Sequence, residues 1–195
     1  MDLNAANWAR FLRIALIPFI LLAMSHPWGP DYCVAGALYW AAASTDVLDG
    51  YLVRRRGGDT PAGTFLDLTA DKLLASCTMI VMLGQALLPA WVVIVVVARE
   101  LAVTGLRSYA ASKGQPISTN IWGKAKMAVT SLAITGTLLE EDLAQSGLMA
   151  RANPLGLAGA VLSFAWPLMV VAVTLTVFSG ASYVLVHIRG LRSRG

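Results

Sequence analysis

Four aspartates form two regularly spaced pairs inside an otherwise apolar stretch of the sequence. Asp46 and Asp49 are three residues apart, and Asp67 and Asp71 are four residues apart. Both spacings place the two carboxylates of a pair on one face of a helix. The segment RRRGGDTP between the pairs predicts a turn. Two antiparallel helices would then bring the pairs face to face.

Such a cluster predicts a site for hard metal ions. Four carboxylates repel one another unless positive charge lies among them, and their oxygens suit Mg²⁺ or Mn²⁺ better than zinc. Two divalent ions that share carboxylates can clamp a phosphoryl group during its displacement. Gly50 and Gly63 let a ligand approach the backbone, and the planar fork of Arg54 can contact a phosphate. Asp59 is expected to be a solvated turn residue.

The composition indicates a membrane protein with helical spans. The 195 residues are 57% hydrophobic and 13% charged, which is outside the range of soluble globular domains. Long apolar segments without alternation favour helices over barrel strands. We therefore predict one all-α integral membrane domain, residues 1–195, with six transmembrane helices. The expected spans are 9–26, 31–53, 63–87, 89–112, 122–140 and 155–189. Cys33 and Cys77 are expected to be unpaired thiols.

The distribution of basic residues predicts the orientation of these helices. If both termini are cytoplasmic, fourteen of the 15 Lys and Arg residues fall on the inner side, and only Arg151 falls outside. This bias follows the positive-inside rule. The net charge of +4 is then explained by topology and by contact with anionic lipids, and it does not indicate nucleic acid. The inner set comprises Arg10, Arg13, Arg54, Arg55, Arg56, Lys72, Arg99, Arg107, Lys113, Lys124, Lys126, Arg189, Arg192 and Arg194.

The aspartate segment resembles the signature of the CDP-alcohol phosphotransferase family, D-x-x-D-G-x-x-A-R-x(8)-G-x-x-x-D-x-x-x-D. Every fixed position matches at the correct spacing except Val53, where the family usually has alanine. The resemblance implies a six-helix membrane enzyme, usually a homodimer. Such an enzyme transfers a phosphatidyl group from a CDP-linked lipid to an alcohol and releases CMP.

The resemblance also implies roles for individual residues. The four aspartates, Asp46, Asp49, Asp67 and Asp71, would hold two divalent ions, and Asp71 would double as the general base. The CDP site would be lined by Gly50, Arg54, Thr60 and Gly63.

Other segments are similar to the phosphatidylglycerophosphate synthases within this family. They are NWARFLRIALIPFILL, in which Arg10 replaces the usual threonine, together with AREL, GLRSYAASKG and WGKAKM. This likeness implies CDP-diacylglycerol as donor and sn-glycerol 3-phosphate as acceptor, in a bacterial inner membrane with the active site facing the cytoplasm. Arg99, Arg107 and Lys124 are expected to bind the acceptor phosphate. For Arg99, an ion pair with Glu100 is the alternative, and Lys126 is expected to be a lipid-facing anchor.

Two alternative functions remain open at the level of sequence. The first is the same chemistry with another acceptor, namely phosphatidylglycerol, inositol phosphate or serine, because the signature is common to these enzymes. The second is a divalent-cation transporter. A transporter would explain the aspartates but not the spacing of Gly50, Arg54 and Gly63, and the outer halves of the expected spans lack polar residues for an ion path.

Overall fold

The computed structural model describes residues 5–26, 31–55, 61–113, 121–145, 147–148, 151 and 163–192. Side chains are described within 11–26, 31–45, 69–110, 112–113, 125–145, 147–148, 151 and 163–183. Six long helices and short turns account for this part of the chain, and no strand occurs in it. The all-helical prediction is confirmed.

The helices have the bounds α1 (Ala5–Met24), α2 (Tyr32–Arg55), α3 (Pro61–Gly84), α4 (Ala90–Ser112), α5 (Ile121–Ala144) and α8 (Ala165–Arg192). Their order and number agree with the six expected segments. α3 ends three residues earlier than expected because Ala86 adopts the left-handed conformation, with φ of 59°. The amides of Ala86 and Leu87 then donate to the carbonyls of Leu83 and Met82, which closes the helix.

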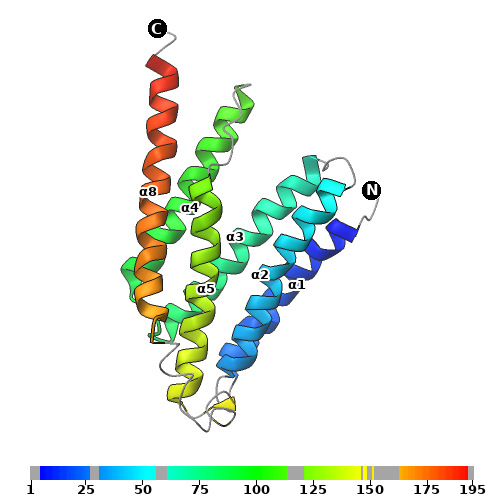
Figure 1. Cartoon of the computed structure of the whole chain (residues 1–195), viewed down its shortest axis with the longest axis vertical. Helices are drawn as coiled ribbons and strands as arrows, with labels where there is room; N and C mark the ends of the chain where they lie inside the picture. The colour runs from blue at the N-terminus through cyan, green and yellow to red at the C-terminus, as the bar shows by residue number, and fades with distance from the viewer. Residues whose placement is uncertain are drawn as a thin grey trace.

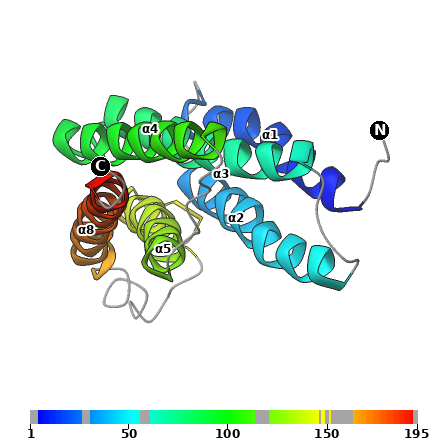
Figure 2. The same ribbon diagram turned by 90° about the horizontal axis from the view of Figure 1, so that it is seen from above.

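The six helices form two rows of three. Figure 2 shows α8, α5 and α2 along one row and α4, α3 and α1 along the other. Within this arrangement α1 packs against α2 and α3, whereas α8 packs against α5 and α4. The contact of α2 with α5 joins the two halves, and the upper ends of the halves diverge in Figure 1. The end of α2 and the start of α3 lie at this upper end.

The two halves are also joined through the N-terminus of α2. Asp31 accepts a hydrogen bond from the amide of Val34 at 3.2 Å, as an N-cap residue does. Asp142 of α5 accepts a second one from the amide of Cys33 at 3.1 Å. Asp142 lies near the C-terminal end of α5 and is 2% exposed. Its carboxylate satisfies a backbone donor that has no partner within the helix.

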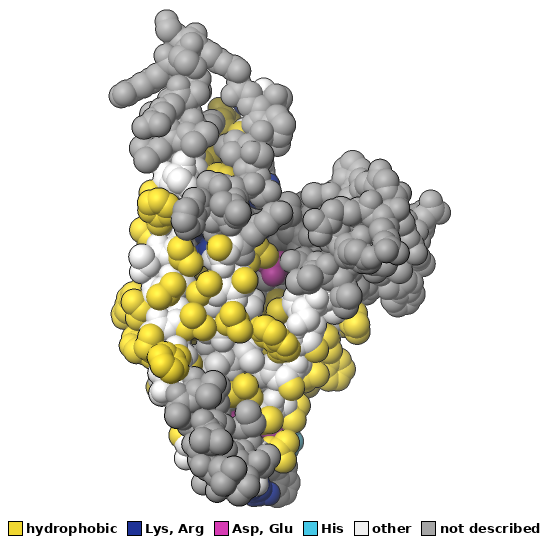
Figure 3. All heavy atoms as spheres, in the orientation of Figure 1, with side chains coloured by type: hydrophobic (Ala, Val, Ile, Leu, Met, Phe, Trp, Pro, Cys, Tyr) yellow, Lys and Arg dark blue, Asp and Glu magenta, His cyan; other side chains and the backbone are white. Residues whose placement is uncertain are grey.

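Large apolar side chains cover the outside of the molecule. Phe19, Leu22, Ile94, Leu101 and Phe164 are each more than half exposed, and apolar side chains extend over most of the described face in Figure 3. In the part of the chain that the structure describes, one stretch, Ala165–Tyr183, is long and apolar enough to cross a membrane. α2 and α3 also carry the four aspartates, and these charges lower their hydropathy.

Arg13 lies inside the bundle. It belongs to the basic residues that were assigned to the cytoplasmic surface, but its side chain is 0% exposed. Its Nε and Nη2 atoms donate to the Thr45 hydroxyl at 3.4 and 3.3 Å. Arg13 therefore links α1 to α2 immediately before Asp46.

The buried cap on α2 predicts a stability effect. Asp142→Ala leaves the Cys33 amide without an acceptor, and we expect the free energy of unfolding to fall by about 1–3 kcal/mol. Thermal unfolding in detergent would measure this as a lower Tm. Glu141→Ala is the matched control, because Glu141 bonds the exposed Gln145 side chain at 2.8 Å. An equal loss of stability in both variants would contradict the role of the buried cap.

Candidate active site

The helices carry the aspartate motif as predicted. Asp46 and Asp49 lie in the second half of α2, and Asp67 and Asp71 lie in the first half of α3. Gly50 and Arg54 also lie on α2, and Gly63 on α3. Thr60 is outside the described residues, and so are the side chains of Asp46, Asp49, Arg54 and Asp67. That the two pairs of aspartates lie face to face therefore stays a prediction.

Asp71 has a described side chain, and it lines a small polar cavity. Three helices form the walls: α3 provides Asp71, Lys72, Ala75 and Ser76, α4 provides Val96 and Glu100, and α5 provides Lys126, Met127, Thr130 and Ser131. In Figure 3, acidic atoms appear at the base of the notch between the two halves of the molecule. The final aspartate of the motif thus opens onto charged and hydroxyl groups from the other half.

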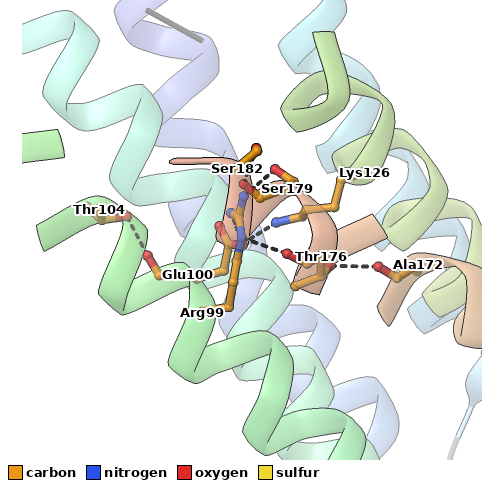
Figure 4. A network of polar contacts seen from close by, with 8 residues as sticks. All are labelled: Arg99, Glu100, Thr104, Lys126, Ala172, Thr176, Ser179 and Ser182. Atoms are coloured by element: carbon orange, nitrogen blue, oxygen red, sulfur yellow. Dashed lines mark hydrogen bonds and ion pairs between the residues drawn. The ribbon is translucent and has the colours of Figure 1, made fainter. Parts of the chain in front are cut away.

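A buried ionic network forms one wall of this cavity (Figure 4). Glu100 Oε1 accepts from Arg99 Nη1 at 2.8 Å and also forms an ion pair with Lys126 Nζ. The side chains of all three residues are at most 14% exposed. Each positive charge therefore offsets the cost of placing the carboxylate inside the bundle.

Arg99 uses its remaining contacts to hold α8. Its Nε donates to the Thr176 carbonyl oxygen at 3.1 Å, and its Nη2 donates to the Ser179 hydroxyl at 2.6 Å. The guanidinium also lies 5.9 Å from the centre of the Tyr183 ring. Gly180 makes this approach possible, because a Cβ atom there would lie 3.1 Å from Arg99 Cγ. Arg99 thus forms the ion pair with Glu100 that the sequence analysis gave as the alternative to phosphate binding.

Lys126 differs from its expected role as a lipid-facing anchor. The residue is 4% exposed and pairs with Glu100 across the α4–α5 contact. The anchor prediction is wrong, because the first turns of α5 face the interior of the bundle here.

Lys72 and Glu100 are cavity residues that the sequence analysis did not single out for the site. Lys72 follows Asp71 directly and interacts electrostatically with Glu100 and Arg107. The sequence did contain a signal for both residues, because an ionisable residue inside an apolar span often marks a functional position.

Arg107 is two turns beyond Arg99 on α4. Its side chain is partly exposed and forms no hydrogen bond or ion pair with another described residue. Lys124 lies on the first turn of α5, and its side chain is outside the described part. Of the three expected phosphate ligands, Arg107 is the one with a described guanidinium that is not committed to such a contact.

The donor set of the motif fits hard divalent ions, since it consists of carboxylates alone. No group of three acidic, histidine or cysteine side chains converges within the described residues. Asp46, Asp49 and Asp67 are outside that search. Of the four expected metal ligands, only Asp71 has a described side chain.

A larger cavity of about 530 Å³ lies elsewhere, between the first turns of α2, the second half of α5 and the start of α8. Its described lining is apolar apart from Thr135 and the Cys33 thiol, and it contains no charged side chain. Of these two cavities, the smaller one at Asp71 is the candidate active site, because it offers groups that can exchange protons or hold charge.

Comparisons with known proteins identify the family of this chain. The family model for CDP-alcohol phosphatidyltransferases matches residues 3–178. The chain is 40% identical over 148 residues to the CDP-diacylglycerol–glycerol-3-phosphate 3-phosphatidyltransferase of Bacillus subtilis, covering 70% of this chain and 77% of that protein. The enzyme of that name from Pseudomonas fluorescens is 35% identical over 140 residues, 68% of this chain and 70% of its own length.

A fuller match comes from Mycobacterium tuberculosis. A probable phosphatidylglycerophosphate synthase of this organism is 35% identical over 197 residues, which covers 98% of this chain and 84% of the relative. The aspartate signature, the helical bundle and a family match over most of the length agree with one another. The chain belongs to the CDP-alcohol phosphatidyltransferase family.

Proposed function

We propose that this protein transfers the phosphatidyl group of CDP-diacylglycerol to sn-glycerol 3-phosphate, giving phosphatidylglycerophosphate and CMP. The observation that carries the proposal is the position of Asp71. This last residue of the family signature lines a polar cavity together with Lys72, Glu100 and Lys126. The relatives from Bacillus subtilis and Pseudomonas fluorescens bear the name of this activity.

Asp71 acts as the general base in this reaction. The acceptor hydroxyl oxygen forms a bond to the phosphorus that carries diacylglycerol, and the proton of that hydroxyl passes to Asp71. The bond from this phosphorus to the bridging pyrophosphate oxygen breaks, and CMP leaves with that oxygen. A carboxylate is a weak base, so its placement against the attacking hydroxyl supplies much of the advantage.

The signature residues hold the donor. Bound at Asp46, Asp49, Asp67 and Asp71, two Mg²⁺ or Mn²⁺ ions would neutralise the charge that develops on the pyrophosphate and on CMP. The nucleotide lies against the end of α2 and the start of α3, where the signature has Gly50, Arg54, Thr60 and Gly63. Val53 replaces the alanine of the family pattern at this contact.

The acceptor phosphate lies on the other side of Asp71, toward α4 and α5. Arg107 and Lys124 bind it directly in this proposal. Arg99 adds positive charge nearby, while its guanidinium stays on Glu100, Thr176 and Ser179. This division matches the described contacts of Arg99 and Arg107.

The six helices span a bacterial inner membrane, with both termini and the active site toward the cytoplasm. The basic-residue bias and the large apolar side chains on the outer surface support this topology. Arg55 and Arg56 contact anionic lipid headgroups. The family resemblance supports a homodimer.

The function is tested by an acceptor panel. The purified protein is incubated with CDP-diacylglycerol, Mg²⁺ or Mn²⁺ and one acceptor at a time, and CMP release is followed. We expect release with glycerol 3-phosphate and little with phosphatidylglycerol, inositol phosphate or serine. A chelator should stop the reaction, and added Mg²⁺ or Mn²⁺ should restore it. Release with inositol phosphate alone would refute the acceptor assignment, and no release with any acceptor would refute the activity.

Asp71→Asn tests the general base. The amide has the shape of the carboxylate but cannot take up the proton, so we expect CMP release to fall below detection. Size-exclusion chromatography and Tm in detergent should match the wild-type protein. Asp59→Asn is the control, since Asp59 lies outside the signature and should keep full activity. Turnover in Asp71→Asn close to the wild-type rate would exclude the role as base.

Arg107→Ala tests the acceptor side. Loss of a charged contact to phosphate should raise the KM for glycerol 3-phosphate by about tenfold or more and leave the KM for CDP-diacylglycerol unchanged. Lys113→Ala is the control immediately after the same helix, because Lys113 is exposed and lies over the Tyr109 ring at 5.9 Å. A raised KM for the lipid nucleotide instead would place Arg107 in the donor site.

A further inference from the structure

The hydroxyl of Thr130 is buried at the Asp71 cavity without a hydrogen-bond partner. Thr130 is 5% exposed, and its Oγ1 atom accepts from and donates to no other group in the described part of the protein. A buried hydroxyl left unpaired costs about 1–3 kcal/mol. Such a group in a native protein calls for an explanation, and one explanation is a bound ligand.

Five other threonines on these helices satisfy their hydroxyls locally. Those of Thr78, Thr104, Thr137, Thr174 and Thr176 each donate to the carbonyl four residues earlier, at 2.6–2.9 Å. Thr130 does not make this bond to the Lys126 carbonyl. Its hydroxyl is therefore available to the cavity that the residue lines.

The groups around Thr130 offer further polar contacts. Both ion pairs of Glu100 use Oε1, and Oε2 receives no hydrogen bond from a described residue. Ser131 also lines the cavity, and the buried phenol of Tyr39 lies near Ser131 and Asp71. The cavity thus presents a hydroxyl and a carboxylate oxygen beside the proposed base.

Charge and size indicate a neutral ligand group. Glu100 and Lys126 cancel each other's charge, so this pocket offers little attraction to a phosphate dianion. The free volume is about 20 Å³, which is enough for one water-sized group. A single alcohol hydroxyl fits both conditions, whereas a phosphate group is too large.

We propose that this pocket binds the secondary hydroxyl of the acceptor, and that Thr130 is its hydrogen-bonding partner. This inference rests on the proposed function. Glycerol 3-phosphate carries its secondary hydroxyl on the carbon next to the attacking primary hydroxyl. Holding the secondary hydroxyl at Thr130 and Glu100 Oε2 positions the primary hydroxyl at Asp71, while the phosphate extends toward Arg107. Thr130 then distinguishes a vicinal diol from a simple alcohol.

The test combines one substitution with one altered acceptor. The acceptors are glycerol 3-phosphate and 3-hydroxypropyl phosphate, which lacks only the secondary hydroxyl, and the enzymes are the wild type and Thr130→Val. We expect wild-type kcat/KM to be about three- to tenfold higher for glycerol 3-phosphate. Thr130→Val should lose this preference and treat the two acceptors alike. The KM for CDP-diacylglycerol should stay constant.

Two variants serve as controls. Thr130→Ser retains the hydroxyl and should retain the preference. Thr135→Val removes another buried, unpartnered hydroxyl on α5, but that one lies at the apolar cavity, so the preference should again be unchanged. If Thr130→Val does not fold, the wild-type comparison and Thr130→Ser still decide the matter.

The outcomes separate this inference from the proposed function. If the wild type releases CMP equally with both acceptors, or if Thr130→Val keeps the full preference, the pocket holds ordered water only and the inference is wrong while the function stands. Absence of CMP release from glycerol 3-phosphate in the wild type refutes the proposed function, and the inference with it.

Discussion

The half of the bundle formed by α4, α5 and α8 depends on the burial of one carboxylate. Glu100 lies inside a bundle with an apolar exterior, and an unpaired charge there would cost several kcal/mol. Arg99 and Lys126 both bond Oε1 of this carboxylate, so their side chains connect α4 to α5. Arg99 in turn reaches the backbone and a hydroxyl of α8, which it can do because Gly180 has no side chain. One buried charge thereby ties α4, α5 and α8 together.

Satisfied and unsatisfied polar groups have different places in this bundle. Threonine hydroxyls within the helices mostly bond their own backbone, which lets them face apolar surroundings at little cost. Asp142 and Arg13 meet partners on neighbouring helices. In contrast, the hydroxyl of Thr130 has no hydrogen-bond partner in the described part of the protein, and it lines the same cavity as Asp71. Most polar groups that pack the fold are thus paired within it, whereas Thr130 at the Asp71 cavity and Thr135 at the apolar cavity are not.

The sequence analysis succeeded where local spacing carries the information. Apolar length and turn residues predicted six helices, and the aspartate signature predicted the family. Contacts between side chains on different helices were harder to predict from the sequence. Lys126 was expected to be an anchor, because a basic residue near a helix end is usually exposed. Its actual burial depends on which helix faces it, and a one-dimensional pattern does not contain that information.

The sequence by itself determined the helical class, the helix order, the family and the residues of the aspartate motif. These properties follow from hydrophobic length and from fixed spacing along one or two adjacent helices. Tertiary structure alone decided that Arg99 binds Glu100 and α8, that Lys126 and Thr130 face the same cavity as Asp71, and that Asp142 caps α2. Apart from the neighbouring pair Arg99 and Glu100, each of these contacts joins residues far apart in the chain, so it depends on the packing of whole helices.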